Sequence, residues 1–140
     1  MPKTNYQEEI DEEDPRIVQA IIYLSEPRPT EGGEPSDEPS LETQRELCRS
    51  KAAKIGAEIG VEFVDKVADL RLRPMLFRAT VLCEYERIDY LIISSLDRLP
   101  DNRNQALVTG LKLGRNGVTL VTPNTEVDPP LMGATLLSRD

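Results

Sequence analysis

Residues 88–101 read Ile-Asp-Tyr-Leu-Ile-Ile-Ser-Ser-Leu-Asp-Arg-Leu-Pro-Asp, and this stretch decides the fold class. Its first half is apolar, β-branched and without helical periodicity, which predicts a strand covered on both faces of a parallel sheet. Two serines follow, and then Asp97 and Arg98 stand side by side where the strand should end. Ligands of open α/β sheets bind at the carboxyl ends of the strands, so this pair is a candidate functional site. Alternatively, the two residues only cap the sheet and pair with solvent or with each other.

The rest of the chain supplies three further predicted strands and three predicted helices in alternation. Ser40 is the expected N-cap of the first helix, Pro74 the expected first residue of the second, and Asp101 the expected cap of the third. The third helix is expected to turn Ala106, Leu107, Gly110, Leu111 and Gly114 inward. The other strands are predicted at residues 17–24, 61–64 and 118–121, and the helices at 41–60, from 74 through 83, and from 101 to 117. This order predicts an α/β three-layer sandwich with a mainly parallel, roughly four-stranded sheet and right-handed crossovers.

Composition divides the chain into one domain and three flanking or inserted segments. Residues 1–15 are predicted to be an acidic, disordered tail, and residues 16–122 form the α/β domain. Within the domain, residues 25–39 hold four prolines and two glycines and are expected to form a flexible acidic loop. Residues 123–140 carry three more prolines and are expected to be an irregular C-terminal tail.

Charge and composition narrow the function classes. The chain has a formal charge of −8, yet residues 1–43 hold 12 acidic against 3 basic residues, whereas residues 44–115 hold 10 against 13. The acidity therefore belongs to the N-terminal third, and the folded body is mildly basic. The absence of histidine excludes zinc sites of the usual kind and histidine general bases, and Cys48 and Cys83 are expected to be buried apolar residues of two helices. We expect no metal and no cofactor.

Targeting and nucleotide-binding signals are weak. The N-terminus has no apolar core and no later run approaches the length of a membrane span, so a cytoplasmic protein without membrane contact is expected. No glycine-rich phosphate-binding motif follows the first predicted strand, because Gly32 and Gly33 lie too far downstream among acidic residues.

Five short motifs occur in order at the predicted strand ends and helix starts. They are residues 22–24 (Ile-Tyr-Leu), 40–44 (Ser-Leu-Glu-Thr-Gln), 63–66 (Phe-Val-Asp-Lys), 73–76 (Arg-Pro-Met-Leu) and 96–99 (Leu-Asp-Arg-Leu). In this order the chain resembles the catalytic domain of the serine recombinases, the resolvase and invertase family, over roughly residues 17–122.

The resemblance implies a phosphate-handling site. In the family the first strand ends in Tyr-x-Arg-x-Ser, whose serine attacks a DNA phosphodiester, and arginines surround the phosphate because guanidinium groups hold its oxygens in pairs. The positions that match the family's active site are Gln44, Asp65, Arg73, Asp97 and Arg98. The predicted contacts to phosphate or DNA are Arg71, Arg73, Arg98 and Arg103. If the resemblance extends to the site, Gln44, Asp65, Arg73 and Arg98 will converge on one anion-sized cleft.

The sequence departs from the family pattern at the positions that matter most for chemistry. Counting from Tyr23, the family's arginine falls on Ser25 and its nucleophilic serine on Pro27. The family's second arginine of Asp-Arg-Leu-x-Arg falls on Asp101, a carboxylate that would repel phosphate. Ser25 is a possible substitute nucleophile, but a shift of two residues along a strand moves its hydroxyl by about 7 Å. Ser36 lies in the predicted acidic loop.

Three functions stay open at this point. The first is a degenerate recombinase-like domain without strand exchange that serves as a binding or regulatory module, with weakly bound DNA, a full-length recombinase or a second copy as partner. The second is a divergent recombinase or nuclease that still forms a phosphoserine link and relies on a separate DNA-binding subunit. The third is an α/β interaction domain that shares only the fold.

Overall fold

The central sheet has four parallel strands. The structure, a computed structural model, describes residues 17–34 and 37–127, so the predicted N-terminal tail and residues 128–140 of the predicted C-terminal tail lie outside the described residues. The strands are β1 (Gln19–Ser25), β2 (Glu58–Asp65), β3 (Tyr90–Ile92) and β4 (Thr119–Val121). Their spatial order is β2-β1-β3-β4, and each neighbouring pair is parallel.

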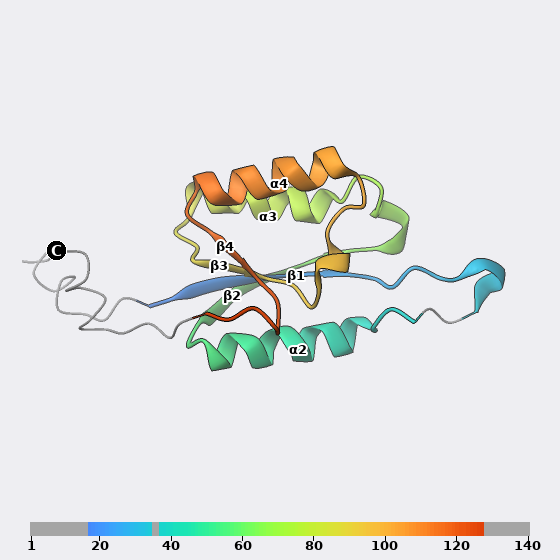
Figure 1. Cartoon of the computed structure of the whole chain (residues 1–140), viewed down its shortest axis with the longest axis horizontal. Helices are drawn as coiled ribbons and strands as arrows, with labels where there is room; N and C mark the ends of the chain where they lie inside the picture. Colours follow the sequence, from blue (N-terminus) through green and yellow to red (C-terminus); the bar gives the residue numbers. More distant parts are fainter. Residues whose placement is uncertain (1–16, 35–36, 128–140) are drawn as a thin grey trace, which may run out of the picture.

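Helices cover both faces of the sheet (Figure 1). One face carries α2 (Leu41–Lys54), and the other carries α3 (Pro74–Tyr85) and α4 (Arg103–Arg115). Single turns of 3-10 helix lie in the connections: η1 (Glu31–Gly33), η2 (Val67–Asp69) and η3 (Leu96–Arg98). The predicted α/β three-layer sandwich with a parallel four-stranded sheet is confirmed.

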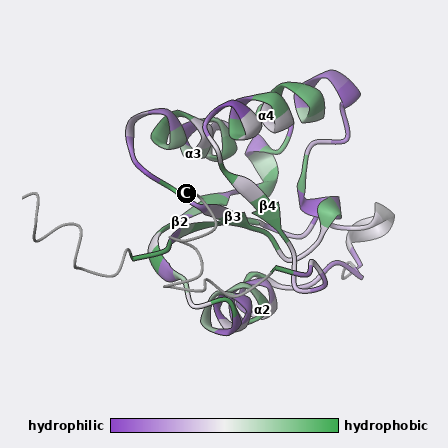
Figure 2. Cartoon of the chain, turned by 60° about the vertical axis from the view of Figure 1, so that its left-hand side comes forward, coloured by the Kyte–Doolittle hydropathy of each residue, from purple (hydrophilic) through white to green (hydrophobic). Residues whose placement is uncertain are grey.

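Strand β1 lies between two hydrophobic clusters because its side chains alternate between the two faces of the sheet. Ile21 and Tyr23 join the cluster beneath α3 and α4, whereas Ile22 and Leu24 join the cluster against α2. In Figure 2 hydrophobic colouring is concentrated where the strands lie between the helical layers. Burying each such side chain contributes roughly 1.5–3 kcal/mol relative to leaving it in water.

The strand predicted in the first half of residues 88–101 is buried on both faces, as expected. Leu91 and Ile93 pack toward α3, and Ile92 packs toward α2; all three side chains are fully buried. The ladder of β3 spans only Tyr90–Ile92, but the amide of Ile93 still donates to the carbonyl of Val121. This apolar run, as β3, thus lies between β1 and β4 and pairs with both.

The first predicted helix is too long by six residues. Helix α2 begins after Ser40, whose hydroxyl accepts a hydrogen bond from the amide of Thr43 as predicted, but it ends at Lys54 instead of residue 60. Gly56 has a φ of 71°, a left-handed conformation that glycine adopts readily and that terminates the helix. The following residues therefore leave the helix, and β2 begins at Glu58, paired with Gln19.

The third predicted helix is correct in position but wrong in its cap and in its inner face. Its cap is Asn102, whose side-chain oxygen accepts from the amide of Gln105, and not Asp101. Leu113 is buried, while Leu107 and Leu111 are 55% and 70% exposed. Gly110 and Gly114 were expected inside, but they offer no side chain to bury, so the helix is rotated to place Leu113 on the sheet. Figure 2 shows hydrophobic residues alternating with hydrophilic ones along α4.

Cys48 in α2 and Cys83 in α3 are free and buried, as predicted. Burial raises the pKa of the Cys48 thiol to about 12 and that of the Cys83 thiol to about 11. Both thiols therefore stay protonated near neutral pH and act as small apolar groups. Within the described ranges, no helix is long and apolar enough to cross a membrane.

Candidate functional site at the carboxyl ends of the strands

Five polar side chains converge where β1, β2 and β3 end, and each is at most 4% exposed. They are Ser25 at the end of β1, Gln44 in the first turn of α2, Asp65 at the end of β2, Arg73 directly before α3, and Arg98 in η3. Because parallel strands end at the same edge of a sheet, residues far apart in the chain meet here. We call these five residues the strand-end cluster.

Asp65 fixes the start of α3. Its carboxylate accepts hydrogen bonds from the backbone amides of Met75 (2.9 Å) and Leu76 (3.1 Å), which are among the amides that have no partner inside the helix. The Tyr23 hydroxyl donates to the same carboxylate at 2.8 Å. Burial, followed by this bond to Asp65, raises the pKa of Tyr23, so the phenol stays protonated.

Arg73 links the Tyr23–Asp65 pair to Arg98. One guanidinium nitrogen, Nη1, donates to the Tyr23 hydroxyl at 3.1 Å and to the backbone carbonyl of Arg98 at 2.7 Å. The residue lies at the N-cap of α3 with φ 50° and ψ 59°, a left-handed conformation that is unfavourable for a side chain with a β-carbon. The backbone at Arg73 is therefore strained, and the hydrogen bonds of its side chain help to hold the residue in this conformation.

Two substitutions at Arg73 separate the free-energy cost of the left-handed backbone from the contribution of the guanidinium side chain. We expect Arg73→Gly to be more stable than Arg73→Ala by roughly 0.5–1 kcal/mol, because both lose the guanidinium but only glycine relieves the left-handed strain. Urea unfolding at neutral pH measures the difference. Equal free energies of unfolding for the two variants would show that the backbone at Arg73 is not strained.

Gln44 holds α2 to the end of β1. Its amide nitrogen donates to the carbonyls of Ser25 (2.7 Å) and Pro39 (3.0 Å), and its oxygen accepts from the Ser25 amide at 3.2 Å. These bonds satisfy the backbone of β1 where its ladder stops. The position of Gln44 is thus explained by backbone hydrogen bonding.

Arg98 lies beneath the loop that follows β1. Its Nη1 donates to the Ser25 hydroxyl at 3.1 Å, and its Nη2 pairs with the Glu38 carboxylate at 3.1 Å. Glu38 also pairs with Arg28 at 3.1 Å, and Arg28 in turn pairs with Asp101 at 2.9 Å. The predicted loop at residues 25–39 thus supplies a carboxylate, Glu38, that pairs with the buried guanidinium of Arg98.

The predicted site residues differ in their placement. Gln44, Asp65, Arg73 and Arg98 join one continuous hydrogen-bond network, and Ser25 belongs to it. Asp97 is exposed, because successive side chains of a 3-10 turn point in different directions and Arg98 is the one that points inward. The other predicted phosphate contacts, Arg71 and Arg103, are also exposed.

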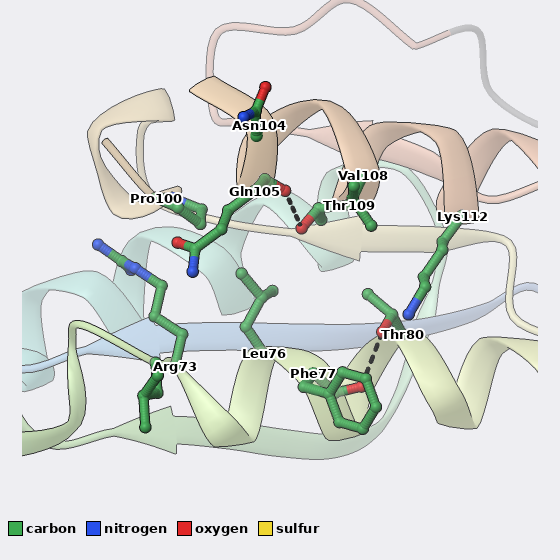
Figure 3. Close-up of a pocket in the computed structure, with 11 residues that line it drawn as sticks. Arg73, Leu76, Phe77, Thr80, Pro100, Asn104, Gln105, Val108, Thr109 and Lys112 are labelled. Atoms are coloured by element: carbon green, nitrogen blue, oxygen red, sulfur yellow. Dashed lines mark hydrogen bonds between the residues drawn. The ribbon is translucent and has the colours of Figure 1, made fainter. Parts of the chain in front are cut away.

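Two hollows adjoin the strand-end cluster. A polar cleft of about 600 Å³ is lined by Arg28, Arg71, Arg73, Asp101 and neighbouring residues, so of the four residues expected to share a cleft only Arg73 lines it. A groove of about 270 Å³ lies between α3 and α4, with Arg73 at one end and Lys112 at the other (Figure 3). The Nε atoms of Arg73 and Arg98 are buried and have no hydrogen-bond partner among the described residues.

Sequence reasoning missed two members of this region, Arg28 and Glu38, and it used Tyr23 only to anchor the first motif. Tyr23 lies two residues before Ser25 and therefore on the same face of β1, which could have marked it as a site residue. Glu38 could not, since it is one of several acidic residues between 26 and 38 and nothing in the sequence distinguishes it. Arg28 is the only basic residue of that loop, a signal that was available.

The fold and the strand-end cluster define an open parallel α/β domain whose buried polar groups lie where such sheets hold their ligands. Residues 29–137 match the family described as "Resolvase, N terminal domain". The chain belongs to this family, and it is a serine-recombinase-like domain linked to DNA recombination. No curated protein sequence matches the chain significantly.

Solved structures with the same fold share little sequence identity with the chain. The C-terminal catalytic domain of ISC1926 TnpA, an IS607-like serine recombinase, is 20% identical with a TM-score of 0.60, covering 87% of this chain and 77% of its own. The N-terminal catalytic domain of TP901-1 integrase is 18% identical with a TM-score of 0.61, covering 86% and 90%. The first open reading frame in transposon ISC1904 from Sulfolobus solfataricus P2 is 17% identical with a TM-score of 0.55, covering 87% and 82%.

Proposed function

We propose that this domain does not exchange DNA strands and instead serves as a binding or regulatory module of DNA recombination. The observation that carries the proposal is the chemistry of the first strand's end. Where the family pattern places the nucleophilic serine, the chain has Pro27, which has no hydroxyl. Where the pattern places a second arginine, it has Asp101, which pairs with Arg28 at 2.9 Å.

The carboxylates near the guanidiniums also oppose phosphoryl transfer. Such a reaction needs unpaired donors aimed at the charged phosphate oxygens. Here Glu38 pairs with Arg98, and Asp101 stands beside the cleft that Arg73 lines. Each lost donor of this kind lowers a rate by roughly 100- to 1000-fold.

The partners that fit this proposal are DNA, bound weakly by the domain alone, a full-length recombinase, or a second copy of the domain. The basic surface that would meet DNA includes Arg71 and Arg103, both exposed. An electrophoretic mobility shift at a stated salt concentration tests the DNA partner, because phosphate contacts weaken steeply with salt.

One observation favours the alternative of a divergent enzyme. The Ser25 hydroxyl lies 3.1 Å from Arg98 Nη1, and a serine beside a guanidinium is a feature of phosphoryl transfer. Against it, Ser25 is 1% exposed, and its Oγ already accepts a hydrogen bond from the group that would hold the phosphate. A phosphodiester cannot reach this hydroxyl without displacing the residues that cover it.

A nicked suicide DNA substrate decides between the two. We expect no covalent serine–DNA adduct from the wild-type chain, with a strand-exchanging serine recombinase as the positive control. In a true reaction the serine oxygen would bond to phosphorus, the P–O3′ bond would break, and the leaving 3′ oxygen would take a proton. An adduct that forms with the wild type and disappears in Ser25→Ala would overturn the proposal.

A further inference from the structure

The Glu38 carboxylate is held by two arginines. One oxygen, Oε1, accepts from the backbone amide of Arg28 at 2.7 Å. The other, Oε2, accepts from Arg28 Nη2 and from Arg98 Nη2, both at 3.1 Å. Two guanidiniums and one backbone amide thus surround a single carboxylate, which is the set of donors that binds a phosphate oxygen pair.

Arg98 needs this partner. The residue is 2% exposed, and a buried guanidinium left without an anion costs several kcal/mol. Asp97, its neighbour in the chain, points to solvent and is not placed to pair with it. Glu38, which lies sixty residues earlier in the chain, supplies the compensating charge from outside the sheet.

The Glu38 side chain can leave without unfolding the elements around it. Helix α2 is capped by Ser40, which bonds to Thr43 independently of Glu38. The side chain of Glu38 is 24% exposed, so it has a path to water. After Glu38 withdraws, the N–H donors of Arg98 and Arg28 remain in place, and Arg98 Nε is a further donor without a partner among the described residues. The Ser25 hydroxyl accepts a hydrogen bond from Arg98 and still has its own proton to donate.

We propose that Glu38 is a displaceable internal ligand of a concealed phosphate-binding site formed by Arg98 and Arg28, and that this site binds a phosphate group only when the Glu38 carboxylate withdraws. The inference rests on the proposed function, since it describes how the same strand-end region is regulated. Asp101 adds to the effect, because its carboxylate holds Arg28 and carries a charge that repels an incoming phosphate.

Titration of inorganic phosphate into the full chain at low, fixed ionic strength and pH 7 tests the proposal. We expect Glu38→Gln, which removes the charge but keeps the shape, to bind phosphate at least tenfold more tightly than the wild type. The matched control is Glu42→Gln, an exposed carboxylate in the first turn of α2, which should bind as the wild type does. Circular dichroism establishes that each variant is folded.

A second measurement needs no substitution. In the wild type the amide of Arg28 donates to Glu38, and bound phosphate would replace that carboxylate as its acceptor, so saturating phosphate should shift the amide resonance of Arg28 in NMR spectra. Equal phosphate affinity of the wild type and Glu38→Gln, or an equal gain in Glu38→Gln and Glu42→Gln, would overturn the proposal. An Arg28 amide resonance that does not shift at a phosphate concentration that saturates the wild type would overturn it as well.

A short duplex DNA titrated into the same variants identifies the source of the phosphate. Tighter DNA binding by Glu38→Gln than by Glu42→Gln supports a DNA phosphodiester as ligand, whereas a gain restricted to inorganic phosphate supports a free phosphate. Neither titration depends on a nucleophile. The concealed site can therefore fail while the suicide-substrate result stands, and a covalent adduct would refute the proposed function without affecting phosphate affinity.

Discussion

Replacing Asp65 with alanine is expected to lower the free energy of unfolding by about 3–5 kcal/mol, a large share of the roughly 5–15 kcal/mol that holds a domain folded. The carboxylate is buried and accepts from two amides at the start of α3 and from the Tyr23 hydroxyl. Arg73, at the N-cap position, makes no side-chain cap bond. Asp65 therefore caps α3 from the end of β2, and its loss leaves three donors, two of them buried and one partly buried, without an acceptor.

Asp69→Ala is the matched control. Asp69 is an exposed carboxylate four residues further along, and its contribution to the turn before α3 is made by its backbone carbonyl, which alanine keeps. We expect a change within about 0.5 kcal/mol. Chemical unfolding of both variants at neutral pH gives the comparison, and a loss below 1 kcal/mol in Asp65→Ala would show that the cap is dispensable.

Arg98→Ala is expected to cost about 3 kcal/mol at pH 7, because it removes one partner of a largely buried ion pair and leaves a cavity. The estimate lies at the low end of the range for such pairs, since Glu38 is partly exposed and its charge is partly screened by water. Arg103→Ala is the control, an exposed arginine at the start of α4 whose removal should change stability by less than about 0.5 kcal/mol.

The cost of Arg98→Ala should also depend on pH. Burial acts to raise the pKa of Glu38, but the Arg28 amide and the Arg98 charge outweigh it and hold the pKa below the ordinary value. A carboxyl with a lowered folded pKa stabilises the protein above its unfolded pKa, about 4.3, and loses that contribution as pH falls through the folded pKa. Unfolding curves should therefore show the wild type and Arg98→Ala converging in strongly acidic solution; a constant difference would mean that Glu38 and Arg98 do not form an energetic pair.

Much of the fold followed from local signals. The β-branched run before Ser94 marked the buried strand, and the hydroxyl of Ser40 marked the start of α2. The end of α2 was missed because the periodicity of apolar residues continues through Ile55 and Ile59, and only the left-handed Gly56 separates helix from strand. Helix α4 was rotated in the prediction because glycines were counted as apolar positions, although they have nothing to bury.

The candidate site could likewise be predicted in part from the sequence. Residues on strand ends and helix starts, such as Asp65, Arg73 and Arg98, could be placed from sequence because the family motifs mark them, and parallel topology brings those ends together. The pairing of Glu38 with Arg98 could not, because a long loop reaches many positions and its folded path depends on the tertiary structure. The inward direction of Arg98 and the outward direction of Asp97 likewise depend on the 3-10 turn that holds them.

The position of β1 also determines when this domain can fold. β1 lies inside the sheet yet is synthesised before the other strands, and its partners in β3 follow about 70 residues later, as the pairing of Ala20 with Tyr90 shows. At roughly 5–20 residues per second, a ribosome produces β3 some 4–14 s after β1. The β1–α2–β2 unit can pair earlier, but the face that α3 and α4 will cover stays open to water. A domain whose central contacts are so distant in sequence completes its sheet late, and it folds more slowly than a helical bundle of equal size.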